Sequence, residues 1–200
     1  MSGNVDLVKL FSTVAETLEE NQASLNKADE YNHDHGDHMV DIFQLITGAM
    51  KEAPQKDISQ GLSKASDLLT EKKSGSAAVY AKGLAQAAEY FQDQGLDDVT
   101  QLLPLLQTML GGGQAPVSKK PGGLLDSLVG SIGGEDGLDM GDILSAGAAF
   151  LQSKGEGDSN LEAAVDAIIS ASKMGETPHR AQSSKLVADV LLQALMSGQD

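Results

Sequence analysis

The sequence predicts an all-α fold, an antiparallel helical barrel or bundle of about eight helices. Apolar residues recur at the three- and four-residue spacing of one helix face in nearly every ordered stretch, and no stretch alternates with the period of two that strands require. These apolar residues are mainly Leu, Ala, Val, Ile and Met, which suits helices with small side chains at their contacts. At 200 residues, the chain has the length of a single domain.

Five helices are expected in the first half of the chain. Apolar residues on one face define them, with glutamates opposite the first. The second is expected to stop at Pro54 because proline cannot continue a helix, and Gly111 closes the fifth. Asp57 precedes the third and Ser74 opens the fourth. The expected ranges are 5–18, 38–53, 58–69, 74–95 and 99–110.

A glycine-rich stretch at residues 111–137 interrupts this pattern. It contains Pro116 and Pro121 and one short apolar helix. Its composition alone fits either a linker between domains or a mobile loop within one domain. Helices are expected to resume at residues 140–153, 161–174 and 181–196.

The charge and the missing cysteines exclude several function classes. Fourteen Lys and Arg stand against 29 Asp and Glu, so the formal charge is −15 and nucleic-acid binding is not expected. Without Cys there is no disulfide framework, thiolate zinc site or cysteine nucleophile. No apolar run approaches a membrane span and no signal peptide is visible, so a soluble, cytoplasmic protein is expected. A secreted protein whose leader has been removed stays an alternative.

An acidic, histidine-rich loop is the first candidate site. Three of the four His lie within six residues and alternate with carboxylates. Oxygen ligands in such a loop suit Mg²⁺, whereas the imidazoles suit zinc or another transition ion. In a simpler interpretation Asp37 caps the following helix and the His are solvated. The candidate oxygen ligands are Asn32, Asp34 and Asp37, and the imidazoles are those of His33, His35 and His38.

Two further segments carry positive charge near small residues. Lys72 and Lys73 precede Ser74, Gly75 and Ser76, which would let a phosphate approach backbone N–H groups. An ordinary capped turn explains the same residues. Arg180, the only Arg, follows His179 and could clamp a phosphate or a carboxylate. It could equally belong to the charged first turn of the last helix.

Taken in order, these segments resemble the nucleotide-binding L subunit of dihydroxyacetone kinase, a DhaL-like domain. That family has a Leu-Asp-x-x-Ile-Gly-Asp-Gly-Asp-His-Gly-x-x-Met loop, which is similar to the stretch from Leu25-Asn26 to Asp34-His35-Gly36-Asp37-His38-Met39. The family's glycine-serine phosphate loop looks like residues 72–76. Its Thr-Met-x-Asp-x-Leu segment looks like residues 139–144, which include Met140, and its Gly-Arg-Ala-Ser segment looks like residues 179–183.

The resemblance implies an eight-helix barrel that binds ADP or ATP at one end through two Mg²⁺ for phosphoryl transfer. It implies that residues 111–137 form a lid within one domain, and that a substrate-binding or phosphocarrier subunit is a partner. The metal ligands would be Asn32, Asp34 and Asp37. The implied nucleotide contacts are His35, His38, Met39, Lys73, Ser74, Gly75, Ser76, Met140 and Arg180.

The chain also departs from the family's pattern. The family's three metal-binding Asp map onto Lys27 or Asn26, onto Asn32 and onto Asp34, so only Asp34 keeps its type. Asp29 and Asp37 are alternative acidic ligands, and the two Lys at 72–73 would replace part of the ion charge. Phosphoryl transfer depends on that charge, so a second hypothesis is a non-catalytic helical-barrel module. Such a module would bind a transition metal on His33, His35 and His38, or a protein partner.

Overall fold

A computed structural model describes residues 6–53, 57–92, 102–111, 166, 169–170 and 174–197. Within these ranges all regular secondary structure is helical and there is no strand, so the all-α prediction is confirmed there. None of the described helices has both the length and the apolar character needed to cross a lipid bilayer. The helices are α1 (Leu7–Ala28), α2 (His35–Glu52), α3 (Ile58–Thr70), α4 (Gly75–Phe91), α5 (Leu102–Gly111) and α9 (Pro178–Ser197).

Two helices begin three residues before their expected starts. Helix α2 starts at His35 rather than His38, because Asp34 and not Asp37 occupies the N-cap position. Helix α9 starts at Pro178 rather than residue 181, since proline fits the first turn of a helix, where its missing N–H is not needed. The predictions for residues 112–165, which include Met140 and all but the first residue of the glycine-rich stretch, lie outside the described residues.

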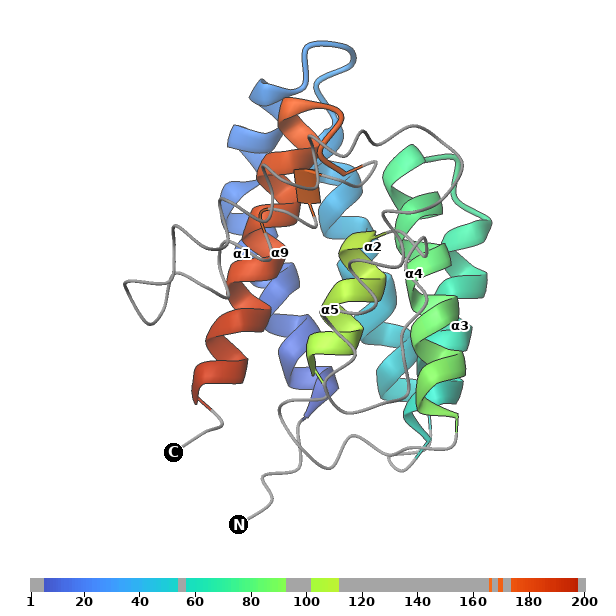
Figure 1. Cartoon of the computed structure of the whole chain (residues 1–200). Coiled ribbons are helices and arrows are strands. Elements are labelled where there is room, and N and C mark those ends of the chain that lie inside the picture. The colour runs from blue at the N-terminus through green and yellow to red at the C-terminus, as the bar shows by residue number, and fades with distance from the viewer. Residues whose placement is uncertain are drawn as a thin grey trace, which may run out of the picture.

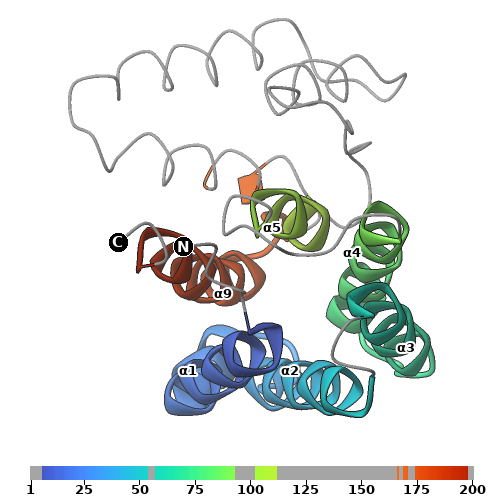
Figure 2. The same ribbon diagram turned by 90° about the horizontal axis from the view of Figure 1, so that it is seen from below.

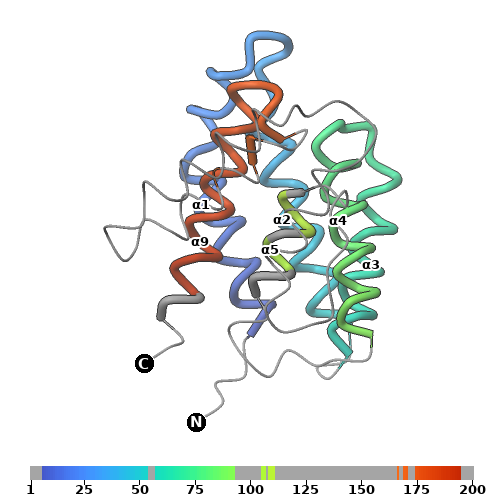
Figure 3. The backbone as a smooth tube through the Cα atoms, in the orientation of Figure 1, coloured from blue at the N-terminus to red at the C-terminus, as the bar shows by residue number. Residues whose placement is uncertain are grey.

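The six helices form a closed ring. Each packs against the next in chain order, and α9 packs against both α5 and α1. Figure 1 shows that successive helices alternate in direction, and Figure 2 shows the ring seen along the helices. Because of this alternation, α2, α4 and α9 all begin at one end, at the top of the tube trace in Figure 3.

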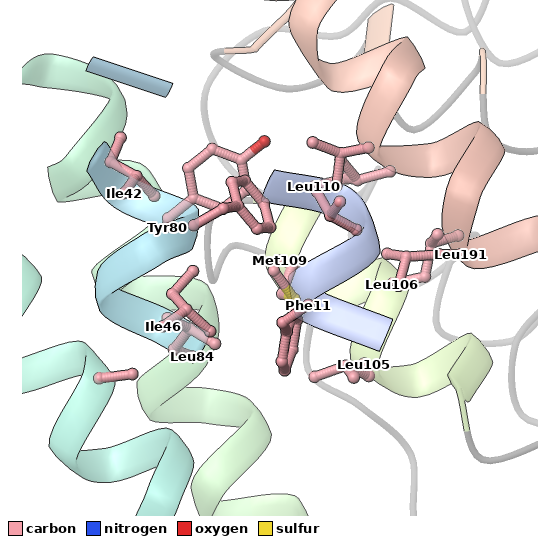
Figure 4. Packing of buried hydrophobic residues seen from close by; sticks show 14 of the residues in the cluster. Phe11, Ile42, Ile46, Tyr80, Leu84, Leu105, Leu106, Met109, Leu110 and Leu191 are labelled. Carbon is pink, nitrogen blue, oxygen red and sulfur yellow. The ribbon is translucent and has the colours of Figure 1, made fainter. Parts of the chain in front are cut away.

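Apolar side chains fill the inside of the ring. Phe11 of α1 lies 6.4 Å from Phe43 of α2, and Phe43 lies edge to face with Tyr80 of α4 at 5.2 Å, measured between ring centroids. Figure 4 shows side chains from α2, α4, α5 and α9 gathering around Phe11. Burying this surface at about 25 cal/mol per Å² is the main force that closes the ring.

Helices α4 and α5 approach so closely that only glycine fits between them. A Cβ at Gly83 would lie 2.3 Å from the backbone oxygen of Thr108, which cannot move without displacing α5. Gly48, inside α2, is the opposite case, because a Cβ there would meet nothing within 4 Å. The two glycines therefore form a matched pair for testing this packing.

We expect Gly83→Ala to lower the free energy of unfolding by about 1–3 kcal/mol, because overpacking forces the two helices apart. Gly48→Ala should raise it by up to about 1 kcal/mol, since alanine is the better helix former. Urea unfolding followed by circular dichroism measures both. Two variants with the same midpoint would contradict the packing of α4 on α5.

Candidate functional site

The three predicted segments meet at the end of the ring where α2, α4 and α9 begin. The loop of residues 29–34 enters α2, residues 72–74 enter α4 and Thr177 precedes α9. Figure 1 shows the loop between α1 and α2 beside the start of α9. This convergence brings together residues that the sequence separates by up to 148 positions.

The start of α2 is capped by a side chain of α1. Asn26 Oδ1 accepts hydrogen bonds from the N–H groups of Gly36 at 2.6 Å and Asp37 at 3.2 Å. The Asn26 amide also donates to Asp37 Oδ1 at 2.7 Å, and Gln22 donates to the same oxygen at 2.8 Å. Two of the backbone N–H groups of the first turn are thus satisfied from within the protein.

Backbone geometry favours glycine at one position in the loop and at one in the first turn of α2. His33 has a φ of 57°, in the left-handed region that glycine adopts most readily. A Cβ at Gly36 would lie 2.3 Å from the backbone oxygen of Gln22, so α1 and α2 can approach here only with glycine. The positive φ thus holds His33 in a strained conformation, and its Nδ1 lies 3.3 Å from the backbone oxygen of Asn26.

A buried polar cluster joins α2 to α9. His35 Nε2 lies 2.9 Å from Ser183 Oγ, and the Ser183 hydroxyl donates to the backbone oxygen of Arg180 at 3.0 Å. Because the single hydroxyl proton is used there, His35 Nε2 must be the donor to Ser183. The His35 ring also packs on the His179 ring, with 4.6 Å between centroids.

Burial and neighbouring charge keep His35 neutral. The pKa of His35 is lowered to about 4, first by burial and then by the neighbouring His179 and Arg180, while Asp29 opposes them. Burial raises the pKa of Asp29, but the N–H of Tyr31 and the charge of His179 outweigh it, and the net pKa is below its ordinary value. Asp29 therefore stays ionised and lies 3.9 Å from His179 Nδ1.

Arg180 lies over the first residue of α4. A Cβ at Gly75 would be 2.6 Å from Arg180 Nη2, so the guanidinium occupies the space that a side chain would need. Arg180 Nε is buried and has no hydrogen-bond partner. Within the described ranges no carboxylate forms an ion pair with Arg180.

The start of α4 keeps two backbone donors. Ser74 Oγ accepts from the Ala77 N–H at the long distance of 3.5 Å. For the N–H groups of Gly75 and Ser76, no acceptor is found in the described part of the chain. Because helix N-termini carry partial positive charge, Arg180 adds a full charge to a site that already attracts anions.

The other predicted nucleotide contacts are distributed unevenly. Met39 is fully buried in the core and Ser76 is buried, whereas Lys73 is exposed beside the start of α4. Lys72 is paired with Asp41 of α2 at 2.8 Å. The structure therefore groups Lys73, Ser74, Gly75 and Arg180, and places Met39 away from solvent.

The predicted metal ligands have separate partners. Asp34 Oδ1 lies 3.2 Å from His38 Nδ1, Asp37 is bound by Gln22 and Asn26, and Asn32 is exposed. Among the described residues, no group of three or more His, Asp or Glu side chains gathers closely enough to hold an ion. In this arrangement the donors do not fit a two-magnesium site, because Asp37 would first have to release both amides.

The three imidazoles of the alternative metal prediction also point to different partners. His33 contacts the Asn26 backbone, His35 contacts Ser183 and His38 contacts Asp34. A shared ion would require His35 to leave its buried position. The transition-metal hypothesis stays a prediction.

Sequence reasoning missed Asn26 as a cap, Ser183 as the partner of His35, and Tyr31. No spacing rule links Asn26 to α2, since the contact depends on how α1 crosses it. Tyr31 stood out only as one of few aromatics in the chain.

Comparison with known proteins adds no assignment, because no protein-family model, no curated protein and no solved structure matches the chain.

We expect Asn26→Ala to destabilise the protein by about 1–2 kcal/mol, because the start of α2 loses its cap. Asn21→Ala is the matched control, because among the described residues Asn21 bonds only to the Thr17 backbone oxygen within α1. Its loss should cost about 0.5 kcal/mol or less. Urea unfolding gives the energies, and hydrogen exchange should show lost protection at the amides of Gly36 and Asp37. Equal losses in the two variants would show that Asn26 does not cap α2.

The lowered pKa of His35 predicts a pH dependence of stability. The unfolded chain binds a proton at His35 below about pH 6.5, whereas the folded chain does so only near pH 4, so stability falls as the pH drops through this window. One proton contributes at most about 1.4 kcal/mol per pH unit, and solvent screening reduces this. His35→Gln should flatten the slope of the free energy of unfolding against pH, and His38→Gln should leave that slope unchanged. Urea unfolding at pH 7, 6 and 5 measures it, and equal slopes in all three proteins would refute the assignment.

Proposed function

We propose that this chain is a divergent L domain of the dihydroxyacetone kinase type that binds the phosphates of ADP or ATP between α4 and α9. The ligand's phosphate would accept hydrogen bonds from the N–H groups of Gly75 and Ser76 and from Arg180. Lys73, exposed at the same end, would add long-range attraction.

The position of Arg180 is the observation that carries this proposal. Its guanidinium lies against Gly75 with no acidic partner among the described residues. A buried, unpaired guanidinium nitrogen costs free energy, and the positive ends of two helices beside it increase that cost. A bound phosphate removes both penalties, because its oxygens accept bidentate hydrogen bonds and neutralise the charge.

The site is the exception in a strongly acidic protein. With a formal charge of −15, the chain as a whole repels anions. The chain has one Arg, and the fold places it beside the start of α4, where the N–H groups of Gly75 and Ser76 have no acceptor among the described residues. Helix α2 is capped by Asn26, and α9 begins on a proline that has no N–H.

Two backbone features support the resemblance to the kinase L domain. The family's loop has glycine where this chain has His33, and the positive φ of His33 is the conformation that glycine favours. The family also has glycine at the position of Gly36, where no Cβ fits. These features concern backbone shape and are independent of the charged residues that prompted the comparison.

Several parts of the proposal extend beyond the phosphate site. The eight-helix barrel would add further helices to the ring of six. The two-ion site that the resemblance implies does not fit these donors, since Asp37 is bound by Gln22 and Asn26 and Asp34 lies against His38. A single magnesium carried by the nucleotide would meet only the oxygen donors of Asn32 and Asp34. Phosphoryl transfer to an acceptor held by a partner subunit completes the family's scheme, although the chain keeps only Asp34 of the family's three metal ligands.

Isothermal titration with inorganic pyrophosphate and with ADP, each with and without Mg²⁺, tests the proposal. We expect both anions to bind, and Arg180→Gln to weaken each by about tenfold or more, since a charge-assisted bond contributes about 1.5–3 kcal/mol. Gly75→Ala should weaken them as well, because its Cβ displaces the guanidinium. Lys82→Gln removes the same charge from an exposed position on α4 and should change little.

Absence of binding by the unmodified protein at millimolar pyrophosphate and ADP would overturn the proposal. Equal effects of Arg180→Gln and Lys82→Gln would show that general charge, rather than this site, attracts the anion. For the magnesium part, Asp34→Asn should remove any gain in ADP affinity on adding Mg²⁺ while leaving metal-free pyrophosphate binding intact.

A further inference from the structure

Tyr31 is the large apolar side chain that the described surface leaves in water. Its side chain is 84% exposed, and no other large hydrophobic residue in the described ranges is exposed. Its neighbours Glu30, Asn32 and His33 are exposed polar residues. The ring therefore stands alone at the tip of the loop and is not part of an apolar patch.

The loop holds this ring in a defined place. The Tyr31 N–H donates to Asp29 Oδ1 at 3.1 Å, and Asp29 is itself buried beside His179. The Tyr31 ring meets the His179 ring edge to face, at 6.5 Å between centroids and 82° between planes, which is a favourable aromatic geometry. His179 directly precedes Arg180 in the first turn of α9, so the ring lies at the same end of the helix ring as the proposed phosphate site.

We propose that Tyr31 is a stacking surface for the aromatic base of the ligand, an inference that rests on the proposed function. It assigns the residue that would recognise the base, whereas the proposed function assigns only the residues that would bind the phosphates. An ordered ring with a face in water loses little conformational entropy on binding, and stacking on a base is tolerant of which base it is.

The surroundings of Tyr31 favour a planar small ligand over a protein partner. A stable protein interface buries about 1,200 Å² or more around a cluster of anchors sheltered from water. Here a single ring is surrounded by charged and polar residues. A base needs only one face of the ring, and its phosphates would have their own recognition at Arg180.

Titration of ADP and inorganic pyrophosphate into Tyr31→Ala, Tyr31→Phe and the unmodified protein tests this inference. We expect Tyr31→Ala to weaken ADP about tenfold and to leave pyrophosphate within twofold, because pyrophosphate has no base to stack. Tyr31→Phe should bind ADP like the unmodified protein, since the ring and not the hydroxyl makes the contact. Glu30→Ala serves as a control for changes in the loop.

The outcomes separate this inference from the proposed function. If Tyr31→Ala leaves ADP binding unchanged while pyrophosphate still binds at Arg180, the stacking role is refuted and the phosphate site stands; the exposed ring then belongs to a protein contact. Equal weakening of ADP and pyrophosphate also refutes stacking, because Tyr31 would then only support the loop. Failure of the unmodified protein to bind pyrophosphate overturns the phosphate site, and the stacking role falls with it.

Discussion

The carboxamide of Asn26 fixes where α2 begins, and the arrangement of the candidate site depends on that point. It accepts hydrogen bonds from the N–H groups of Gly36 and Asp37, so that His35 lies in the first turn. There His35 faces Ser183 of α9. A register shift of one residue in α2 would turn its side chains by about 100° and direct another side chain into that contact. The absence of a Cβ at Gly36 lets α1 come close enough for the cap to form. Helix geometry at one crossing thus determines which histidine is buried and which is exposed.

Electrostatics divides the ring into two regions. The chain as a whole carries a formal charge of −15, whereas the end formed by the starts of α2, α4 and α9 combines helix dipoles with Arg180. The first backbone N–H groups differ among these three starts. The Asn26 side chain caps α2, α9 begins on a proline that has no N–H, and Ser74 caps α4 through one long hydrogen bond. His35 stays neutral in this environment because burial and the nearby positive charges both disfavour its protonation. The region therefore concentrates its positive charge on Arg180 rather than sharing it with the imidazole.

Local periodicity predicts that each described helix exists, because each buries an apolar face whose spacing is visible in the chain. It predicts an end at residue 18 for the first helix, whereas α1 continues to Ala28. The same periodicity predicts starts three residues late for α2 and α9, since it does not report the polar first turn. Of the site, sequence order indicated the loop, Gly75 and Arg180, but it could not show that Arg180 lies on Gly75 or that Asp37 is bound by Gln22 and Asn26. Met39 was grouped with the loop for its position in a motif, whereas packing places it in the core. These relations are set by how helices cross, which residue spacing does not encode.

The closure of the ring by α9 has a consequence for how the site forms. His35 and Ser183 are 148 residues apart, so their contact carries a large loop-closure entropy and is expected late in folding. Until α9 docks between α1 and α5, Arg180 is not at the start of α4, and the anion site does not exist. Any ligand that bridges the two helices would act as a clamp, because it stabilises only the closed ring, by RT ln(1 + [L]/Kd). The fraction of time that α9 spends detached would then fall as the concentration of that ligand rises. The same contact would serve both binding and assembly.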